Sequence, residues 1–160
     1  MPRKLFVKGC VGHGMVIGRE VMVWNWEWHC RSPPLENASV SLTRNVLDVA
    51  LKRCGVPRDA RHDIGLALTE ACANAVRHSD AERDYQVDAA LHRDRCVVEV
   101  TDHGSGFAIE DFGEGAPPDA EGGRGLHLIH ALTDRVEIRH HRGRGVTVHF
   151  EKVLDAALAG

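Results

Sequence analysis

The sequence predicts one α/β domain of the α+β type, a two-layer sandwich in which a mostly antiparallel mixed sheet carries helices on one face. Three observations predict this fold. The 160 residues suffice for one buried core. Apolar residues recur with a helical period within residues 37–78. Segments in which apolar and polar residues alternate, joined by short turns, follow this part of the chain. Strands joined in this way pair antiparallel, and the helices then cover one face of their sheet.

The N-terminal segment has a different composition from the rest of the chain. Residues 1–21 are glycine-rich and show no clear period, so we predict a loose extension there and one domain over residues 22–155. The domain begins with Met22, Trp24, Trp26 and Trp28, whose alternation is typical of a strand with one aromatic face. The tryptophans indicate either a binding surface or an edge strand that covers the core or a partner, and we favour the edge strand.

Two helices are predicted next. The first runs from about residue 37 to Cys54, where Gly55 favours a C-terminal cap. Pro57 favours the start of the second, which carries an apolar stripe and ends near residue 78. The stripe consists of Ile64, Leu68, Ala71, Cys72 and Ala75.

The second helix also carries a polar row beside its apolar stripe. Glu70 and Asn74 are four residues apart, so they lie one turn apart on the same face. This spacing is common on solvated helices and indicates little by itself. Together with the glycine-rich segments farther along the chain, it favours a nucleotide pocket in which the helix supplies a base and a magnesium ligand.

A hairpin leads from this helix to the first glycine cluster. Segments 85–91 and 96–100 alternate as strands around a turn at 92–95, and the second strand runs into Asp102. A carboxylate at a strand end can accept a hydrogen bond from an amino group such as that of adenine. Gly104 and Gly106 permit close approach of backbone to a ligand, although an aspartate that merely opens a turn is common in this pattern.

The second glycine cluster is predicted to open a short third helix. Gly123, Gly125 and Leu126 stand at its start, where free N–H groups can hold phosphate oxygens, and Arg124 adds a positive charge. The stretch 107–121 between the clusters indicates a mobile cover over the nucleotide, or a plain surface loop. A final hairpin follows with strands near 136–138 and 146–150.

Composition limits the function classes. The chain has 20 Lys and Arg against 23 Asp and Glu, a net charge of −3, which gives no general attraction to nucleic acid or to an anionic membrane. No apolar run is long enough for a membrane span or a signal peptide. The five cysteines are scattered and form no C-x-x-C pair, which fits a reducing cytoplasm, and we expect a soluble, cytoplasmic protein. Cys54, Cys72 and Cys96 are expected to be core fillers.

These motifs together resemble a known family. The segment from Glu70 to His78 resembles the N box of the GHKL (histidine-kinase-like) ATPase superfamily, Asp102-x-Gly104-x-Gly106 its G1 box, and Gly123-Arg124-Gly125-Leu126 its G2 box. The short chain and the segment Gly145–Val148 are most similar to bacterial anti-sigma factor serine/threonine kinases. The family usually carries Gly-Thr-Thr in this last motif, whereas position 146 is valine here.

The resemblance implies a histidine-kinase-like ATPase (Bergerat) fold and a role for each matching residue. It implies that Glu70 is the general base, that Asn74 coordinates Mg²⁺, and that Asp102 binds the adenine amino group. It further implies that ATP is held by the glycine motifs and that Thr147 supports the adenine side. The nucleotide-binding set so implied is Asn74, Asp102, Gly104, Gly106, Gly123, Arg124, Gly125, Leu126 and Thr147.

The implied function is that of an anti-sigma factor with serine kinase activity. Such a protein phosphorylates an anti-anti-sigma antagonist, sequesters a sigma factor and commonly forms a homodimer. Three alternatives stay open at this point: an ATP-dependent binding module without phosphotransfer, the ATPase domain of a sensor histidine kinase, and an interaction domain without a ligand.

Overall fold

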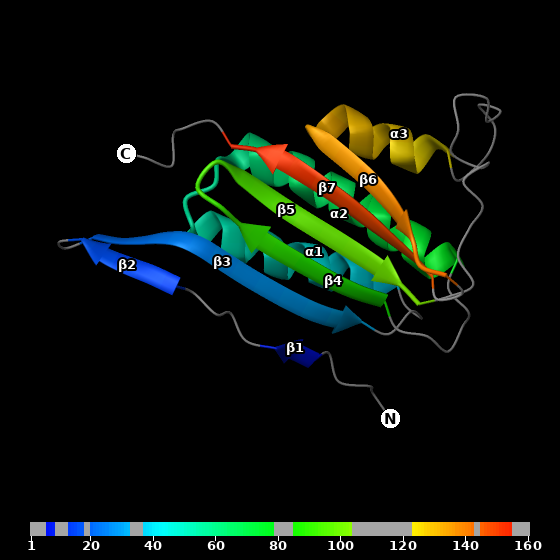
Figure 1. Ribbon diagram of the computed structural model, residues 1–160, viewed down its shortest axis with the longest axis horizontal. Coiled ribbons are helices and arrows are strands. Elements are labelled where there is room, and N and C mark those ends of the chain that lie inside the picture. The colour runs from blue at the N-terminus through cyan, green and yellow to red at the C-terminus, as the bar shows by residue number, and fades with distance from the viewer. Residues whose placement is uncertain are drawn as a thin grey trace.

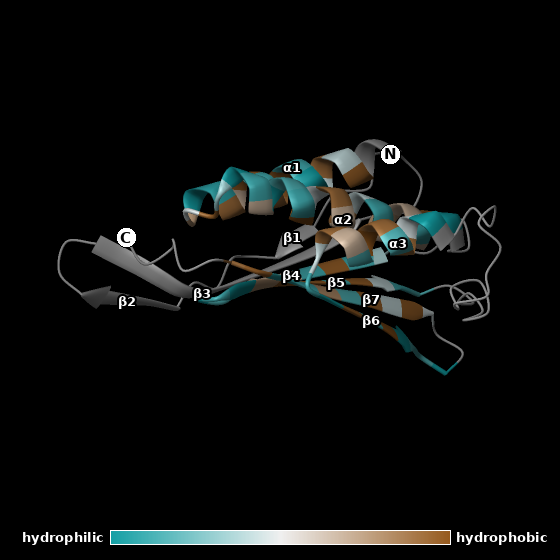
Figure 2. Ribbon diagram, turned by 90° about the horizontal axis from the view of Figure 1, so that it is seen from above, coloured by the Kyte–Doolittle hydropathy of each residue, from teal (hydrophilic) through white to brown (hydrophobic). Residues whose placement is uncertain are grey.

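The structure is a computed structural model of the chain, described here for residues 6–8, 13–17, 20–32, 37–78, 85–103, 123–142 and 145–154. These residues form a seven-stranded sheet and three helices, and the helices all lie on one side of the sheet (Figures 1 and 2). The predicted two-layer α+β sandwich is confirmed. In chain order the elements are β1 (Phe6–Lys8), β2 (His13–Ile17), β3 (Glu20–Ser32), α1 (Asn37–Arg53), α2 (Arg58–His78), β4 (Tyr85–Leu91), β5 (Arg95–Asp102), α3 (Gly123–Leu132), β6 (Arg135–His140) and β7 (Val146–Val153).

The strand order is β1-β3-β4-β5-β7-β6, with β2 paired to β3 off this path. Every strand pair in the described residues is antiparallel. The last strand, β7, lies between β5 and β6 rather than at the edge, so its neighbour β5 comes from a distant part of the sequence. This insertion places Val146 opposite Asp102 at the end of β5.

The N-terminal strands differ from what the sequence predicts. The tryptophan-containing strand β3 is not an edge strand, because it pairs with β4 on one side and with β1 and β2 on the other. In its register with β4, Trp26 lies opposite Leu91 and Trp28 opposite Ala89. Residues 1–21, expected to be a loose extension, contain β1, β2 and the start of β3. The domain boundary at residue 22 stays a prediction.

The end of α1 and the start of α2 lie where Gly55 and Pro57 predict them. Gly55 takes a φ of 80° just after α1, its N–H donates to the Lys52 carbonyl at 3.1 Å, and that of Val56 donates to the Leu51 carbonyl at 3.0 Å. This is a Schellman cap, in which glycine takes the left-handed conformation at little cost. Pro57 precedes α2 and Asp59 lies in its first turn, where an acidic side chain complements the helix dipole.

The core lies between α2 and the centre of the sheet, with α1 and α3 packed on either side of α2. The predicted apolar stripe of α2 is buried throughout, and β4 alternates buried and half-buried side chains along its whole length. Cys72 and Cys96 fill core positions as predicted. Burial, with Cys54 nearby, raises the pKa of the Cys96 thiol to about 12.

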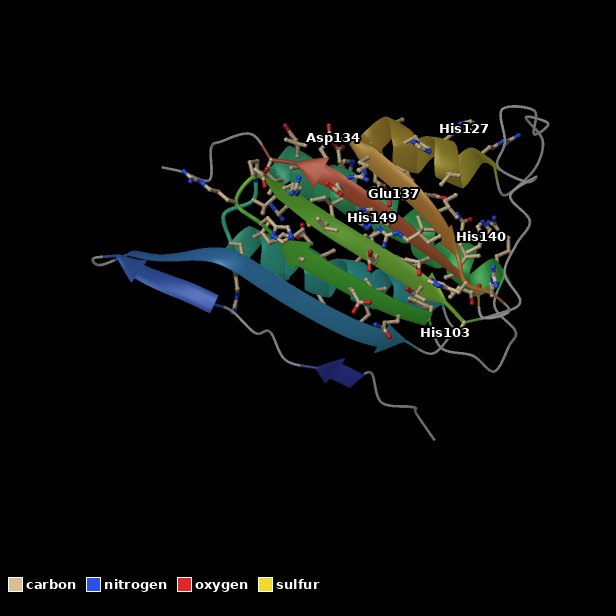
Figure 3. All side chains as sticks on the ribbon, in the orientation of Figure 1. His103, His127, Asp134, Glu137, His140 and His149 are labelled. Atoms are coloured by element: carbon tan, nitrogen blue, oxygen red, sulfur yellow. The ribbon has the colours of Figure 1, made fainter. Side chains whose placement is uncertain are left out.

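The other side of the sheet, which we call the open face, carries charged and polar side chains of β5, β6 and β7. His149, which is labelled in Figure 3, is buried. Its Nδ1 is 2.9 Å from Glu99 Oε1 and its Nε2 is 3.0 Å from Glu151 Oε1, so it lies between two carboxylates. Arg139 donates to Glu99 at 2.8 Å and to Glu137 at 3.0 Å. Hydrogen bonds from Arg139 and then Arg135 lower the pKa of the Glu137 carboxyl.

Candidate active site

Glu70 and Asn74 lie on the side of α2 that packs against α3. Asn74 is buried and Glu70 is half-buried, so neither is the fully solvated helix residue that their spacing alone would allow. Their neighbour is Gly125, in the first turn of α3. A Cβ atom built on Gly125 would lie 2.8 Å from Glu70 Oε2 and 3.4 Å from Asn74 Nδ2. The structure thus brings two of the sequence motifs into direct contact.

The first turn of α3 offers backbone donors next to these side chains. Gly123 begins the helix, and the first N–H groups of a helix have no partner within it. Their partial positive charge favours an anion at this position. The Arg124 side chain is exposed. The Leu126 side chain is buried in the hydrophobic core, so only the backbone of Leu126 can contact a ligand.

Asp102 is the last residue of β5 and is only 2% exposed. It alternates with the buried Val100 and lies opposite the buried Val146, so its side chain is on the face of the sheet that carries the helices. Its Oδ2 atom accepts no hydrogen bond from the described residues, although the residue makes other interactions. A buried carboxylate on this face can accept a hydrogen bond from a bound ligand.

These groups share one end of the molecule. Figure 1 shows the C-terminal half of α2, the start of α3 and the end of β5 at the same end, and His103, which follows Asp102, marks it in Figure 3. The site therefore has a carboxylate and an amide from α2, backbone donors from α3 and a second carboxylate from the sheet. Gly104, Gly106 and the stretch 107–121, where we expect a cover, lie outside the described residues.

Thr147 occupies a different place from the other predicted residues. It lies opposite Thr101 on the open face, where its Oγ1 is 2.9 Å from Thr101 Oγ1 and 2.7 Å from His141 Nε2. Neighbouring strand residues point to opposite faces, so Thr147 points away from the side that holds Asp102. The structure does not bring Thr147 together with the other site residues.

Gly145 enters the sequence analysis only within a motif and without a role, whereas in the structure its backbone lies against that of Asp102. Its φ is 96°, and a Cβ atom built on it would lie 1.8 Å from the Asp102 carbonyl oxygen. Only glycine fits this conformation and this approach. The signal in the sequence was a glycine directly before a strand, which also matches a turn residue.

The fold and this arrangement define a nucleotide-binding ATPase domain, and comparison with known proteins gives the class. Residues 34–152 match the histidine kinase-like ATPase domain family, so the chain belongs to that family.

Its relatives include the serine-protein kinase RsbW of Bacillus subtilis (strain 168). The two are 32% identical over 134 residues, which is 76% of this chain and 82% of the relative. RsbW of Halalkalibacterium halodurans is 32% identical over 120 residues, 69% of this chain and 74% of the relative. RsbW of Listeria monocytogenes serovar 1/2a is 31% identical over 127 residues, 72% of this chain and 81% of the relative.

Proposed function

We propose that the chain is an ATP-dependent serine/threonine protein kinase that acts as an anti-sigma factor. The observation that carries this proposal is the contact between α2 and α3, where Glu70 and Asn74 meet the first turn of α3 at Gly125. The match to serine-protein kinases over most of the chain supports it. Among the described residues no helix is long and apolar enough to cross a membrane.

The residues present suit a magnesium nucleotide. Asn74 is buried beside the first turn of α3, and its amide oxygen is of the type that Mg²⁺ prefers. Mg²⁺ is usually held by one or two protein oxygens together with substrate phosphates, so a single buried asparagine fits. When bound there, Mg²⁺ supplies charge neutralisation during phosphoryl transfer.

Some of these residues bind the nucleotide, and Glu70 takes part in the transfer of phosphate. Asp102 accepts a hydrogen bond from the adenine amino group, while the first-turn N–H groups of α3 and Arg124 hold phosphate oxygens. Gly104 and Gly106 belong to this set as the G1 box. Glu70 accepts the proton of the attacking serine hydroxyl, which is the role of a carboxylate placed beside the phosphates. Thr147 is left out of the proposed site because of its place on the open face.

The partners follow from the family resemblance and are part of the same proposal. The serine lies on an anti-anti-sigma protein, and its phosphorylation frees the kinase to hold a sigma factor. We propose that the protein works in the cytoplasm, as a homodimer and without binding nucleic acid directly.

Replacement of Glu70 tests the proposal. The wild-type protein, Glu70→Gln and the control Asp59→Asn, an exposed acid on the same helix, are incubated with labelled ATP and purified anti-anti-sigma proteins. We expect transfer by the wild type and the control, and a loss of about 10²–10⁴-fold in Glu70→Gln with nucleotide affinity kept. Equal rates in Glu70→Gln would remove Glu70 as the base. A wild type that binds ATP and a sigma factor but transfers no phosphate would show a binding module instead.

A further inference from the structure

The glycine in the first turn of α3 has an unusual neighbour. The Cβ position of Gly125 is 2.8 Å from Glu70 Oε2, and real Cβ atoms essentially never come within 3.0 Å of another heavy atom. Gly65 on α2 gives the contrast, since its Cβ position is 3.5 Å from Arg44 Cγ, an ordinary contact. Gly65 lines a surface hollow between α1 and α2, on the side of α2 away from α3. An added Cβ atom would therefore overlap a neighbouring side chain at Gly125, where that neighbour is the Glu70 carboxylate, but not at Gly65.

The middle and the C-terminal end of α3 are anchored on the core and on α2, whereas Glu70 Oε2 is the end of a flexible side chain and yields more easily. Ile129 is fully buried beneath the helix. At the C-terminal end, Lys152 Nζ donates to the Leu132 carbonyl at 2.9 Å and to Asp63 on α2 at 2.8 Å. A methyl group on residue 125 would push on the flexible end of Glu70 rather than on α3.

We propose that Gly125 is a positioning residue for Glu70. Its missing side chain leaves the space in which the carboxylate lies against the first turn of α3, where the helix dipole favours a negative charge. The packing of α3 on α2 thus sets the place of the proposed base, and Gly125 acts on proton transfer through Glu70. This inference rests on the proposed kinase function and adds a second role to a residue expected only to bind phosphate.

Kinetics separate this role from phosphate binding. In Gly125→Ala the Glu70 carboxylate must move by about 0.6 Å to reach an ordinary contact of 3.4 Å, and a displacement of about 1 Å can cost about 100-fold in rate. We therefore expect kcat of phosphotransfer to fall about 10-fold. Alanine keeps the backbone N–H groups that are proposed to hold phosphate, and binding needs no base, so ADP affinity should fall by no more than about threefold. Gly65→Ala should match the wild type in both. A loss of ADP affinity that accounts for the whole defect of Gly125→Ala, or an unchanged kcat, would overturn the proposal.

A shorter carboxylate provides the rescue. Glu70→Asp withdraws the carboxylate by one methylene, which leaves room for a methyl group on residue 125. Adding Gly125→Ala to Glu70→Asp should then lower kcat by less than about threefold further, against about 10-fold in the wild-type background. Equal losses in both backgrounds would mean that the methyl group acts elsewhere than on Glu70.

Thermal unfolding tests the contact without any kinase activity. Gly125→Ala should lower Tm by about 2–4 °C relative to the same change in Glu70→Ala, where the methyl group meets no carboxylate. A wild type that transfers no phosphate but shows this difference would refute the proposed function and leave the contact standing. Identical Tm shifts in both backgrounds would refute the contact.

Discussion

Replacing Gly145 by alanine should disturb the end of the sheet that carries Asp102. The Cβ of alanine would lie 1.8 Å from the Asp102 carbonyl oxygen and 2.6 Å from its carbon. Both atoms belong to backbone, so no side chain can rotate away. To restore 3.0 Å, the start of β7 and the end of β5 must separate by about 1.2 Å.

Two terms set the expected loss of stability. A left-handed φ costs a residue with a Cβ about 1–2 kcal/mol. Separation of the strands also weakens the pairing of Asp102 with Val146, and each hydrogen bond lost there costs about 1 kcal/mol. We therefore expect the free energy of unfolding to fall by about 2–4 kcal/mol. Movement of Asp102 should also weaken adenine nucleotide binding.

Urea unfolding and calorimetric titration with ADP measure the two effects. The matched control is Gly55→Ala, at the other described glycine with a left-handed φ, which caps α1 away from Asp102. It should lose about 1–2 kcal/mol of stability and keep its ADP affinity. If Gly145→Ala matched the wild type in stability and affinity, the close contact with Asp102 would be wrong. If only stability fell, Asp102 would not depend on this contact.

Two further predictions concern carboxylates. Asp102→Asn keeps the shape of the side chain but loses its charge, so ADP affinity measured by calorimetry should fall by about 1.5–3 kcal/mol; unchanged affinity would make Asp102 a turn residue only. Glu137 should titrate by NMR below its ordinary pKa of 4.5, because Arg139 and then Arg135 hydrogen-bond its charged form. That pairing stabilises the protein above the ordinary pKa and is lost as the pH falls through the lowered one. Arg139→Gln should raise the midpoint toward 4.5, and an unmoved midpoint would contradict the assigned cause.

The elements with strong periods could be predicted from the sequence. The apolar stripe of α2 is set by a 3.6-residue period, and the hairpin of β4 and β5 by a period of two. Because Glu70 and Asn74 flank the stripe, their place at the edge of the core followed from the same period. The contact of both with Gly125 did not follow, since no period within α2 says which helix packs beside it.

The rest depended on long-range pairing, which local patterns do not encode. β2 contains Gly14 and has no clean alternation, so only its pairing with β3 makes it a strand. The insertion of β7 between β5 and β6 is equally invisible in the sequence of β7. For Thr147 the signal was present: Val146, Val148 and Phe150 alternate as core residues, so Thr147 had to point to the other face.

The position of β7 in the sheet bears on the order in which the protein folds. β5 and β7 pair although Gly145 comes 43 positions after Asp102, and β7 follows every other described element along the chain. Contacts of such sequence separation form late, because the intervening chain must first lose entropy. A growing chain can thus complete α1, α2 and the β4–β5 hairpin while Asp102 still lies on an unpaired strand edge. The proposed nucleotide site is then complete only when β7 pairs with β5, so we expect nucleotide binding to report that β7 has joined the sheet.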